Sequence, residues 1–177
     1  HKMHKKVYEK IGDFTMGEKI KRSLFATFMD VDPGYEDWGL VGDGVTAAAI
    51  EYNPEISEEV YIHQDSATAE VERYGPKMPL EAVAIMGDDV FDYVDGLRID
   101  QAVLNDAHTQ VVNVWLYKPV TGQQDTYEAE LRDVTISIES FGGDGGVANR
   151  INYTIHFRGD PVQGKFDADA LTFTANT

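Results

Sequence analysis

The C-terminal half of the chain alternates apolar and polar residues with a period of two. Val134, Ile136 and Ile138 alternate with polar neighbours, and residues 151–157 repeat the pattern as Ile-Asn-Tyr-Thr-Ile-His-Phe. Successive side chains of a β-strand point to opposite faces, so this period is typical of two half-buried strands. Residues 141–146 separate the two runs and contain four glycines, which tolerate the positive φ angles of turns. The pattern therefore predicts a β-hairpin with a wide turn.

Other segments have the composition of further strands. Residues 111–117 are apolar apart from Asn113, which indicates a strand covered on both faces. The turn signal Asn53-Pro54 separates two strand-like segments earlier in the chain. Besides the hairpin, the expected strands cover residues 23–29, 45–52, 59–63, 111–117 and 165–174.

One helix is expected, and it begins at Gly87-Asp88-Asp89. Asp88 or Asp89 can cap the free amides of its first turn. Val90, Val94 and Leu97 give it one apolar face, and Gly96 can end it. The sequence leaves open whether the stretch Ala102-Val103-Leu104 continues the helix or forms a second turn. Seven or eight short strands with one short flanking helix predict a mainly β fold. The expected architecture is two packed antiparallel sheets, as a β-sandwich or a partly closed barrel.

Composition excludes several classes of protein. The 177 residues are 42% hydrophobic, which suits one domain with its own core. The chain has no cysteine, so disulfides, thiol catalysis, cysteine-bound zinc and iron–sulfur clusters are excluded. No apolar run approaches the roughly 18–20 residues of a membrane helix, and no apolar leader segment follows the basic N-terminus. We expect a protein without membrane association.

Charge divides the chain into two parts. Residues 1–22 carry seven bases and three acids, whereas residues 23–177 carry 28 acids and eight bases. We expect residues 1–22 to form a basic, flexible N-terminal arm and residues 23–177 to form a single domain. The sequence leaves open whether residues 1–15 are a native part of this arm, an expression-derived extension or a stretch upstream of a true start at Met16. A body with net charge −20 repels phosphate, which argues against tight nucleic-acid binding.

Several motifs resemble catalytic or ligand sites but lack the context that such sites need. Residues 42–47 and 143–148 match G-x-G-x-x-A, yet strand-like sequence follows both where a dinucleotide site requires a helix. The carboxylates of residues 30–37 do not have the spacing of an EF-hand, so an acidic turn is favoured over a calcium site. The histidines are dispersed and no G-x-S-x-G motif occurs. We expect no catalytic residues, no metal and no cofactor, and hence no enzyme.

The order of certain segments resembles the tail tube (major tail) proteins of long-tailed bacteriophages and prophages. None of these segments is a chemical signature by itself, so the resemblance depends on their number and order over most of residues 21–174. The segments are residues 21–28, 42–46, 50–55, 61–65, 90–98, 141–146, 151–155 and 157–162.

The resemblance implies a tail-tube-like fold and a structural role. Such subunits form hexameric rings that stack into a tube, and DNA passes through the lumen without specific binding. Terminal arms and a long loop bridge subunits and successive rings. The implied partners are further copies of the chain and other tail proteins, namely the tail tip, the terminator and the tape measure. The implied location is the virion tail, after synthesis in the cytoplasm of the bacterial host.

Three sets of residues are candidates for the contacts of such a tube. An acidic lumen would let DNA slide, because it repels phosphate. Strand parity gives as candidates for lumen-facing carboxylates Glu128, Glu130 and Glu139. The candidates for docking the basic arm on the next ring are Lys19, Lys21 and Arg22. The candidates for an inter-subunit loop are Asp32, Tyr35 and Trp38.

The alternative function is a β-sandwich module that binds carbohydrate or protein. Such a module would need an exposed aromatic platform, for which Trp38, Trp115 and Tyr117 are the candidates. We interpret Trp115 as a core residue and Trp38 as a loop residue, which weakens this alternative. Within the tail-tube reading, contractile, non-contractile and bacteriocin-type particles remain open, as do phage and prophage origins.

Overall fold

The computed structural model describes residues 17–177, in which ten strands, one α-helix and two short 3₁₀ helices occur. Most of the predicted basic arm, including all of residues 1–15, lies outside the described residues. The strands are β1 (Phe25–Asp30), β2 (Trp38–Leu40), β3 (Val45–Ala48), β4 (Pro54–Glu59), β5 (Thr68–Tyr74), β6 (Lys77–Val83), β7 (His108–Pro119), β8 (Thr126–Gly142), β9 (Arg150–Asp167) and β10 (Thr172–Ala175). The helices are η1 (Arg22–Leu24), α2 (Asp89–Asp100) and η2 (Leu104–Ala107).

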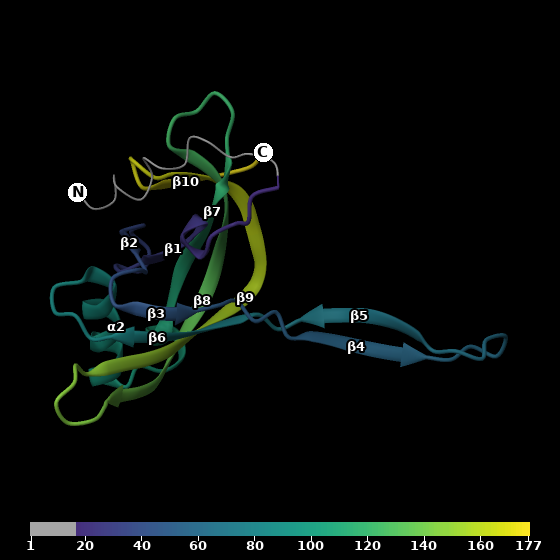
Figure 1. The fold of residues 1–177 in the computed structure, drawn as a ribbon, viewed down its shortest axis with the longest axis horizontal. Coiled ribbons are helices and arrows are strands. Elements are labelled where there is room, and N and C mark those ends of the chain that lie inside the picture. Colours follow the sequence, from purple (N-terminus) through teal and green to yellow (C-terminus); the bar gives the residue numbers. More distant parts are fainter. Residues whose placement is uncertain (1–16) are drawn as a thin grey trace.

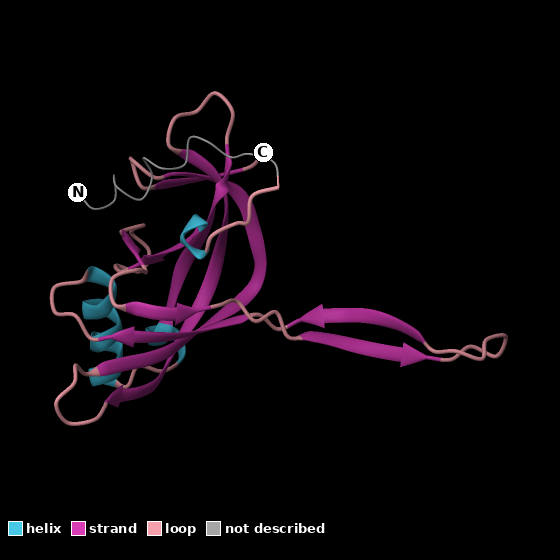
Figure 2. Ribbon diagram, in the orientation of Figure 1, coloured by secondary structure: helices cyan, strands magenta, loops and turns pink. Residues whose placement is uncertain are grey.

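One curled antiparallel sheet forms the body of the molecule (Figure 1). Its strand order is β2-β1-β7-β8-β9-β6-β3, with β10 paired to β9. The mainly β fold with a flanking helix is confirmed. The two packed layers are formed by opposite ends of this sheet, whereas β4 and β5 make a separate two-stranded sheet that projects from the body (Figure 2).

The predicted hairpin is the centre of the sheet. β8 and β9 pair with Ile136 opposite Ile155 and Ile138 opposite Tyr153, so the alternating apolar residues share one face. The predicted strand over residues 111–117 is also confirmed within β7. β9 bulges near Gly159, whose φ is 66°, and Arg132 Nη2 donates to the Gly159 carbonyl at 3.1 Å. Such irregularities bend long strands and allow the sheet to curl.

The sheet buries a different face at each of its two ends. In β7, Val111 belongs to a cluster with Val90 and Val94 of α2, whereas Val112 and Val114 belong to a second cluster. Neighbouring residues of a strand point to opposite faces. One core therefore lies between the sheet and α2, and the other lies on the opposite face of the sheet.

Helix α2 begins where the sequence predicts. The Asp88 carboxylate caps it by accepting a hydrogen bond from the Phe91 amide at 3.0 Å. Burial raises the pKa of Asp88, and nearby carboxylates add to the rise. The predicted end at Gly96 is wrong, because the helix continues to Asp100 and ends with Gln101 in a left-handed conformation. No helix in residues 17–177 has the length and apolar content required to cross a membrane.

The region between residues 45 and 83 departs most from the expected strands. β3 ends at Ala48, and Pro54 begins β4 instead of marking a turn. Residues 60–63, expected within a strand, belong to the connection between β4 and β5. The strands β5 and β6 were not expected at all. β6 alternates buried and exposed residues and pairs with β9, whereas β5 is almost entirely exposed.

Candidate assembly surfaces

A two-stranded arm, residues 54–74, extends away from the body (Figure 1). Its strands pair from Pro54 opposite Tyr74 to Glu59 opposite Thr68, and no other strand of the described chain joins them. A lone two-stranded hairpin is at best marginally stable in water. A hairpin of this kind suits an element that is held by a partner.

The two faces of the arm differ in polarity. Ile56 and Val71 lie directly opposite each other, and each is about half exposed, at 50% and 51%. Alternation places Pro54 and Tyr74 on the same face. The other face is polar, since its side-chain contacts include an ion pair between Glu55 and Arg73 and a hydrogen bond from Ser57 to Glu72. The apolar face has no covering element among residues 17–177.

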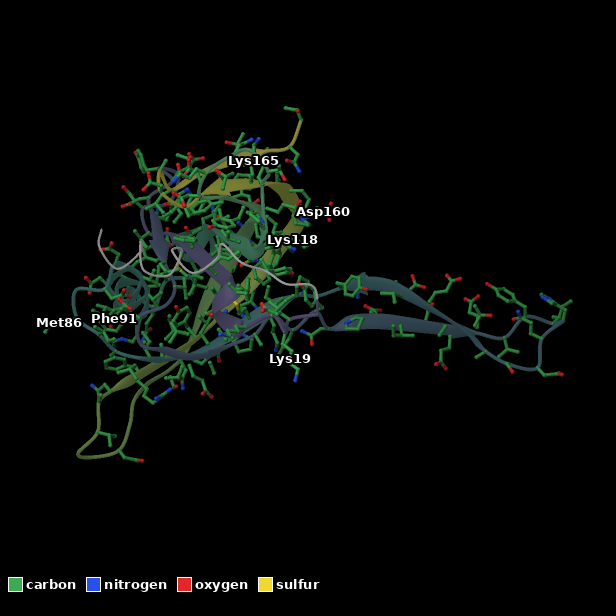
Figure 3. All side chains as sticks on the ribbon, turned by 45° about the horizontal axis from the view of Figure 1, so that its top comes forward. Lys19, Met86, Phe91, Lys118, Asp160 and Lys165 are labelled. Atoms are coloured by element: carbon green, nitrogen blue, oxygen red, sulfur yellow. The ribbon has the colours of Figure 1, made fainter. Side chains whose placement is uncertain are left out.

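The tip of the arm, residues 60–67, presents three consecutive apolar side chains. Val60, Tyr61 and Ile62 are 60%, 47% and 108% exposed. Carboxylates surround them, and the whole arm carries six acids against one arginine. Figure 3 shows carboxylate oxygens along the length of the arm. The tip therefore combines exposed apolar surface with strongly negative charge.

The two chain segments at the root of the arm are held together by hydrogen bonds and a ring contact. The Gly75 amide donates to the Tyr52 carbonyl at 3.0 Å, and Asn53 Nδ2 donates to the Gly75 carbonyl at 3.1 Å. The Tyr52 ring meets the Tyr74 ring edge-on, with centroids 6.3 Å apart. Burial raises the pKa of the Tyr52 phenol, and the Glu130 carboxylate adds to the rise. These contacts fix the direction in which the arm leaves the body.

The three candidate lumen carboxylates do not form one surface. Glu130 is only 9% exposed and accepts a hydrogen bond from Asn113 Nδ2 at 3.0 Å. Glu128 is exposed, and its carboxylate lies 4.0 Å from the Lys118 ammonium. Its neighbour Ala129 belongs to the core on the face opposite α2, so Glu128 itself points to the α2 side of the sheet. Glu139 is exposed, and its carboxylate accepts a hydrogen bond from the Ser137 hydroxyl. It lies on the face of β8 opposite to the residues that face α2. Glu128 and Glu139 thus lie on opposite faces of the sheet.

The candidate inter-subunit loop is only partly exposed. Asp32 and Tyr35 are exposed, but Trp38 is 5% exposed and belongs to the core on the face of the sheet opposite α2. The expectation that Trp38 is a loop residue is wrong, because β2 begins with it and pairs it with Asp30. Of the three candidates, only Asp32 and Tyr35 are therefore exposed and free to contact another subunit.

The same loop is organised by Asp30, a buried carboxylate that belongs to the acidic turn expected at residues 30–37. Its oxygens accept hydrogen bonds from the amides of Asp32, Gly34, Glu36 and Asp37 at 3.1–3.3 Å. An acidic turn is the interpretation that this geometry supports. Within residues 17–177, no group of three or more histidine, aspartate or glutamate side chains is placed to hold a metal ion.

The basic candidates Lys19, Lys21 and Arg22 differ in their freedom. Both lysines are exposed. The Arg22 guanidinium donates to the carbonyls of Phe25 at 2.6 Å and Ala48 at 3.2 Å, and burial lowers its pKa. Arg22 is therefore held by its own chain, while the lysines remain available to a partner.

The candidate aromatic platform is not assembled. Trp38 is in the core, as described above, and Trp115 is half-buried with its ring stacked on Phe25 at a centroid distance of 5.3 Å. Tyr117 is also half-buried. These three residues do not form a shared exposed surface, so the alternative of a carbohydrate-binding module gains no support.

Comparison with known proteins identifies similar folds. No protein-family model matches the sequence, and no curated protein matches it. The fold is similar to that of a chain in the tail of an empty GTA particle with C6 symmetry, at 12% identity over 89% of this chain and 100% of that chain, with a TM-score of 0.54. It is also similar to the sheath/tube terminator of an extracellular contractile injection system, PVC, in the extended state, at 7% identity over 84% and 99% of the two chains, with a TM-score of 0.50. At these identities the likeness establishes the fold.

Proposed function

We propose that the chain is a structural subunit of a phage or prophage tail tube that assembles into stacked, hexameric rings. The observation that carries the proposal is the projecting arm, whose exposed apolar face and tip have no cover among residues 17–177. The similarity of the fold to a chain in a tail with C6 symmetry supports it. The likeness to a tube terminator is consistent with the same class of particle.

The proposed tube conducts DNA without binding it, because the body carries net negative charge. Its partners are further copies of the chain and other tail proteins: tail tip, terminator and tape measure. Residues 23–177 act as its single domain, and Lys19 and Lys21 dock on the next ring. Only one face of a sheet can line a channel, so of Glu128 and Glu139 at most one faces the lumen. The assembled protein is located in the virion tail.

The proposal is tested by comparing the full chain with a variant that lacks the arm. Tyr52 and Gly75 are hydrogen-bonded neighbours, so an Asn-Gly turn can replace residues 54–74 without disturbing the body. Both proteins are followed by size-exclusion chromatography with light scattering and by negative-stain electron microscopy. We expect rings or tubes from the full chain and monomers with an unchanged melting temperature from the variant.

Two results would contradict these expectations. A full chain that stays monomeric up to millimolar concentration would count against a tube subunit. A shortened chain that assembles as well as the full chain would retain the tube but remove the arm from its contacts.

A further inference from the structure

A groove of about 790 Å³ lies between two open strand edges of the body. Among residues 17–177, β2 pairs only with Phe28–Asp30 of β1, which leaves Phe25 and Ala26 with a described partner strand on one side alone. β3 is the last strand at the other end of the sheet and, in the described part of the chain, pairs only with β6. The groove therefore occupies the place where the curled sheet fails to close on itself.

Small apolar residues give this groove its volume. Ala26 lines it on the β1 side, and residues 47–49, three consecutive alanines, line it on the β3 side. Ala47 and Ala49 are exposed. Walls of this kind leave room for bulky apolar side chains, whose burial is favourable because it removes apolar surface from water.

Arg22 fixes the two edges at the mouth of the groove. Its guanidinium donates to the Phe25 carbonyl of β1 and to the Ala48 carbonyl at the end of β3. One side chain thereby holds both edges at a set separation and satisfies two carbonyls that lack a partner strand. The groove is preformed in the isolated chain, so a ligand does not bear the cost of ordering it.

We infer that this groove receives the arm tip of a second copy of the chain, an inference that rests on the proposed function. The tip offers Val60, Tyr61 and Ile62, which are bulky, consecutive and exposed. The arm points away from its own body, so its tip lies far from its own groove (Figure 1). The donor must therefore be another molecule.

The uneven distribution of charge along the groove orients this occupant. The arm has a net charge of −5, and Glu58 and Glu59 immediately precede the apolar tip. Arg22 lines the groove, and the exposed Lys21 precedes it in the chain. Glu51 and Glu81 also line the groove, so the attraction is confined to the Arg22 side. The apolar contact supplies affinity, and the charges select one orientation of the tip.

The geometry also explains how one contact builds an assembly. Each copy donates one arm tip and offers one groove, which is a head-to-tail contact between unlike surfaces. Such contacts close into rings or continue as helical filaments. The contact gives every subunit the same two neighbours, and stacking of closed rings then uses a separate surface, for which Lys19 and Lys21 are proposed.

Site-directed cross-linking tests the inference directly, because the chain has no cysteine. Full-length Ile62→Cys is mixed with full-length Ala47→Cys under assembly conditions, and disulfide formation is followed by non-reducing electrophoresis. The matched control replaces Ala47→Cys by Ala148→Cys, an equally exposed alanine in the β8–β9 loop. We expect the Ile62–Ala47 pair to give about tenfold more cross-linked dimer than the control, because docking raises the local thiol concentration.

A second measurement blocks the groove instead. Ala47→Trp fills it from an exposed position, with Ala148→Trp as control. We expect Ala47→Trp to raise the protein concentration required for assembly by about tenfold, or about 1.4 kcal/mol, while the monomer melts at the same temperature as the control.

Each outcome decides between the inference and the proposed function. Assembly of the wild-type chain with no cross-link above the control, and with no effect of Ala47→Trp, would overturn the groove as acceptor but leave the tube. A cross-link to Ala47→Cys from His4→Cys, and none from Ile62→Cys, would assign the groove to the N-terminal segment and overturn the arm as its occupant. A wild-type chain that never assembles would overturn the proposed function itself.

Discussion

At the scale of single residues, the carboxylate of Asp30 is the side chain on which local structure depends most. It is completely buried and accepts four backbone hydrogen bonds from the loop that follows it. In Asp30→Asn an NH₂ group that only donates would replace one carboxylate oxygen and face two backbone amides that need an acceptor. We therefore expect the free energy of unfolding to fall by about 2–4 kcal/mol. Urea denaturation measures the loss. Asp32→Asn, an exposed neighbour, is the control and should change stability by less than about 0.5 kcal/mol; equal midpoints for the two variants would contradict the prediction.

Single residues also mark where prediction from sequence reaches its limit. Glu128 and Glu130 lie two positions apart on one strand, so parity assigns them to the same face and predicts the same exposure. In the structure Asn113 binds Glu130, and the root of the arm lies beside it, whereas Glu128 remains exposed. Parity identifies the face on which a side chain lies but not what later folds over that face. The burial of Trp38 was missed for a different reason, because no strand was expected at its position and it was assigned to a loop.

At the scale of elements, helix α2 contains a glycine that serves no turn. Gly96 lies inside the helix, and a Cβ added there would meet no atom within 4 Å. Gly96→Ala should therefore raise the free energy of unfolding by about 0.5–1 kcal/mol, because alanine loses less backbone entropy. The matched control is Gly87→Ala, just before the helix, where φ is +87° and alanine is strained although space is available. Thermal or urea unfolding should show higher stability than the parent chain for Gly96→Ala and lower stability for Gly87→Ala. A loss of stability in Gly96→Ala would show that the glycine has a role in packing.

Elements that face the core were predictable, whereas the arm was not. The hairpin of β8 and β9 carries a period-two apolar pattern because one face of each strand is buried in the same chain. The two strands of the arm have only isolated apolar residues, such as Ile56 and Val71, among charged ones. On the proposed function its apolar face is buried by another molecule. When the apolar face of a strand is covered by a partner molecule, the sequence of one chain alone does not show which residues are buried. The strands of the arm could therefore not be predicted from the apolar pattern.

At the scale of the whole molecule, the sheet order was beyond the sequence patterns. Alternation predicts that strands exist, but β1 pairs with β7 and β6 pairs with β9 across long stretches of chain. These pairings depend on how the sheet curls and on which face each end buries. They also create the open edges of β1 and β3, which no local motif could indicate.

The net charge of the whole chain sets the conditions under which the proposed assembly should form. Each copy carries −16, so bringing copies together opposes like charges over most of their surfaces. Salt screens such repulsion, with a Debye length of about 10 Å at 0.1 M, while contacts between apolar surfaces are not weakened by it. We therefore expect the protein concentration at which rings appear to fall several-fold between about 50 mM and about 500 mM sodium chloride. Light scattering across a dilution series at each salt concentration measures this threshold, and the melting temperature of the monomer at both concentrations separates assembly from folding. A threshold that rises with salt would mean that ion pairs, such as those between the acidic arm and Lys19 and Lys21, hold the subunits together more strongly than the apolar tip does.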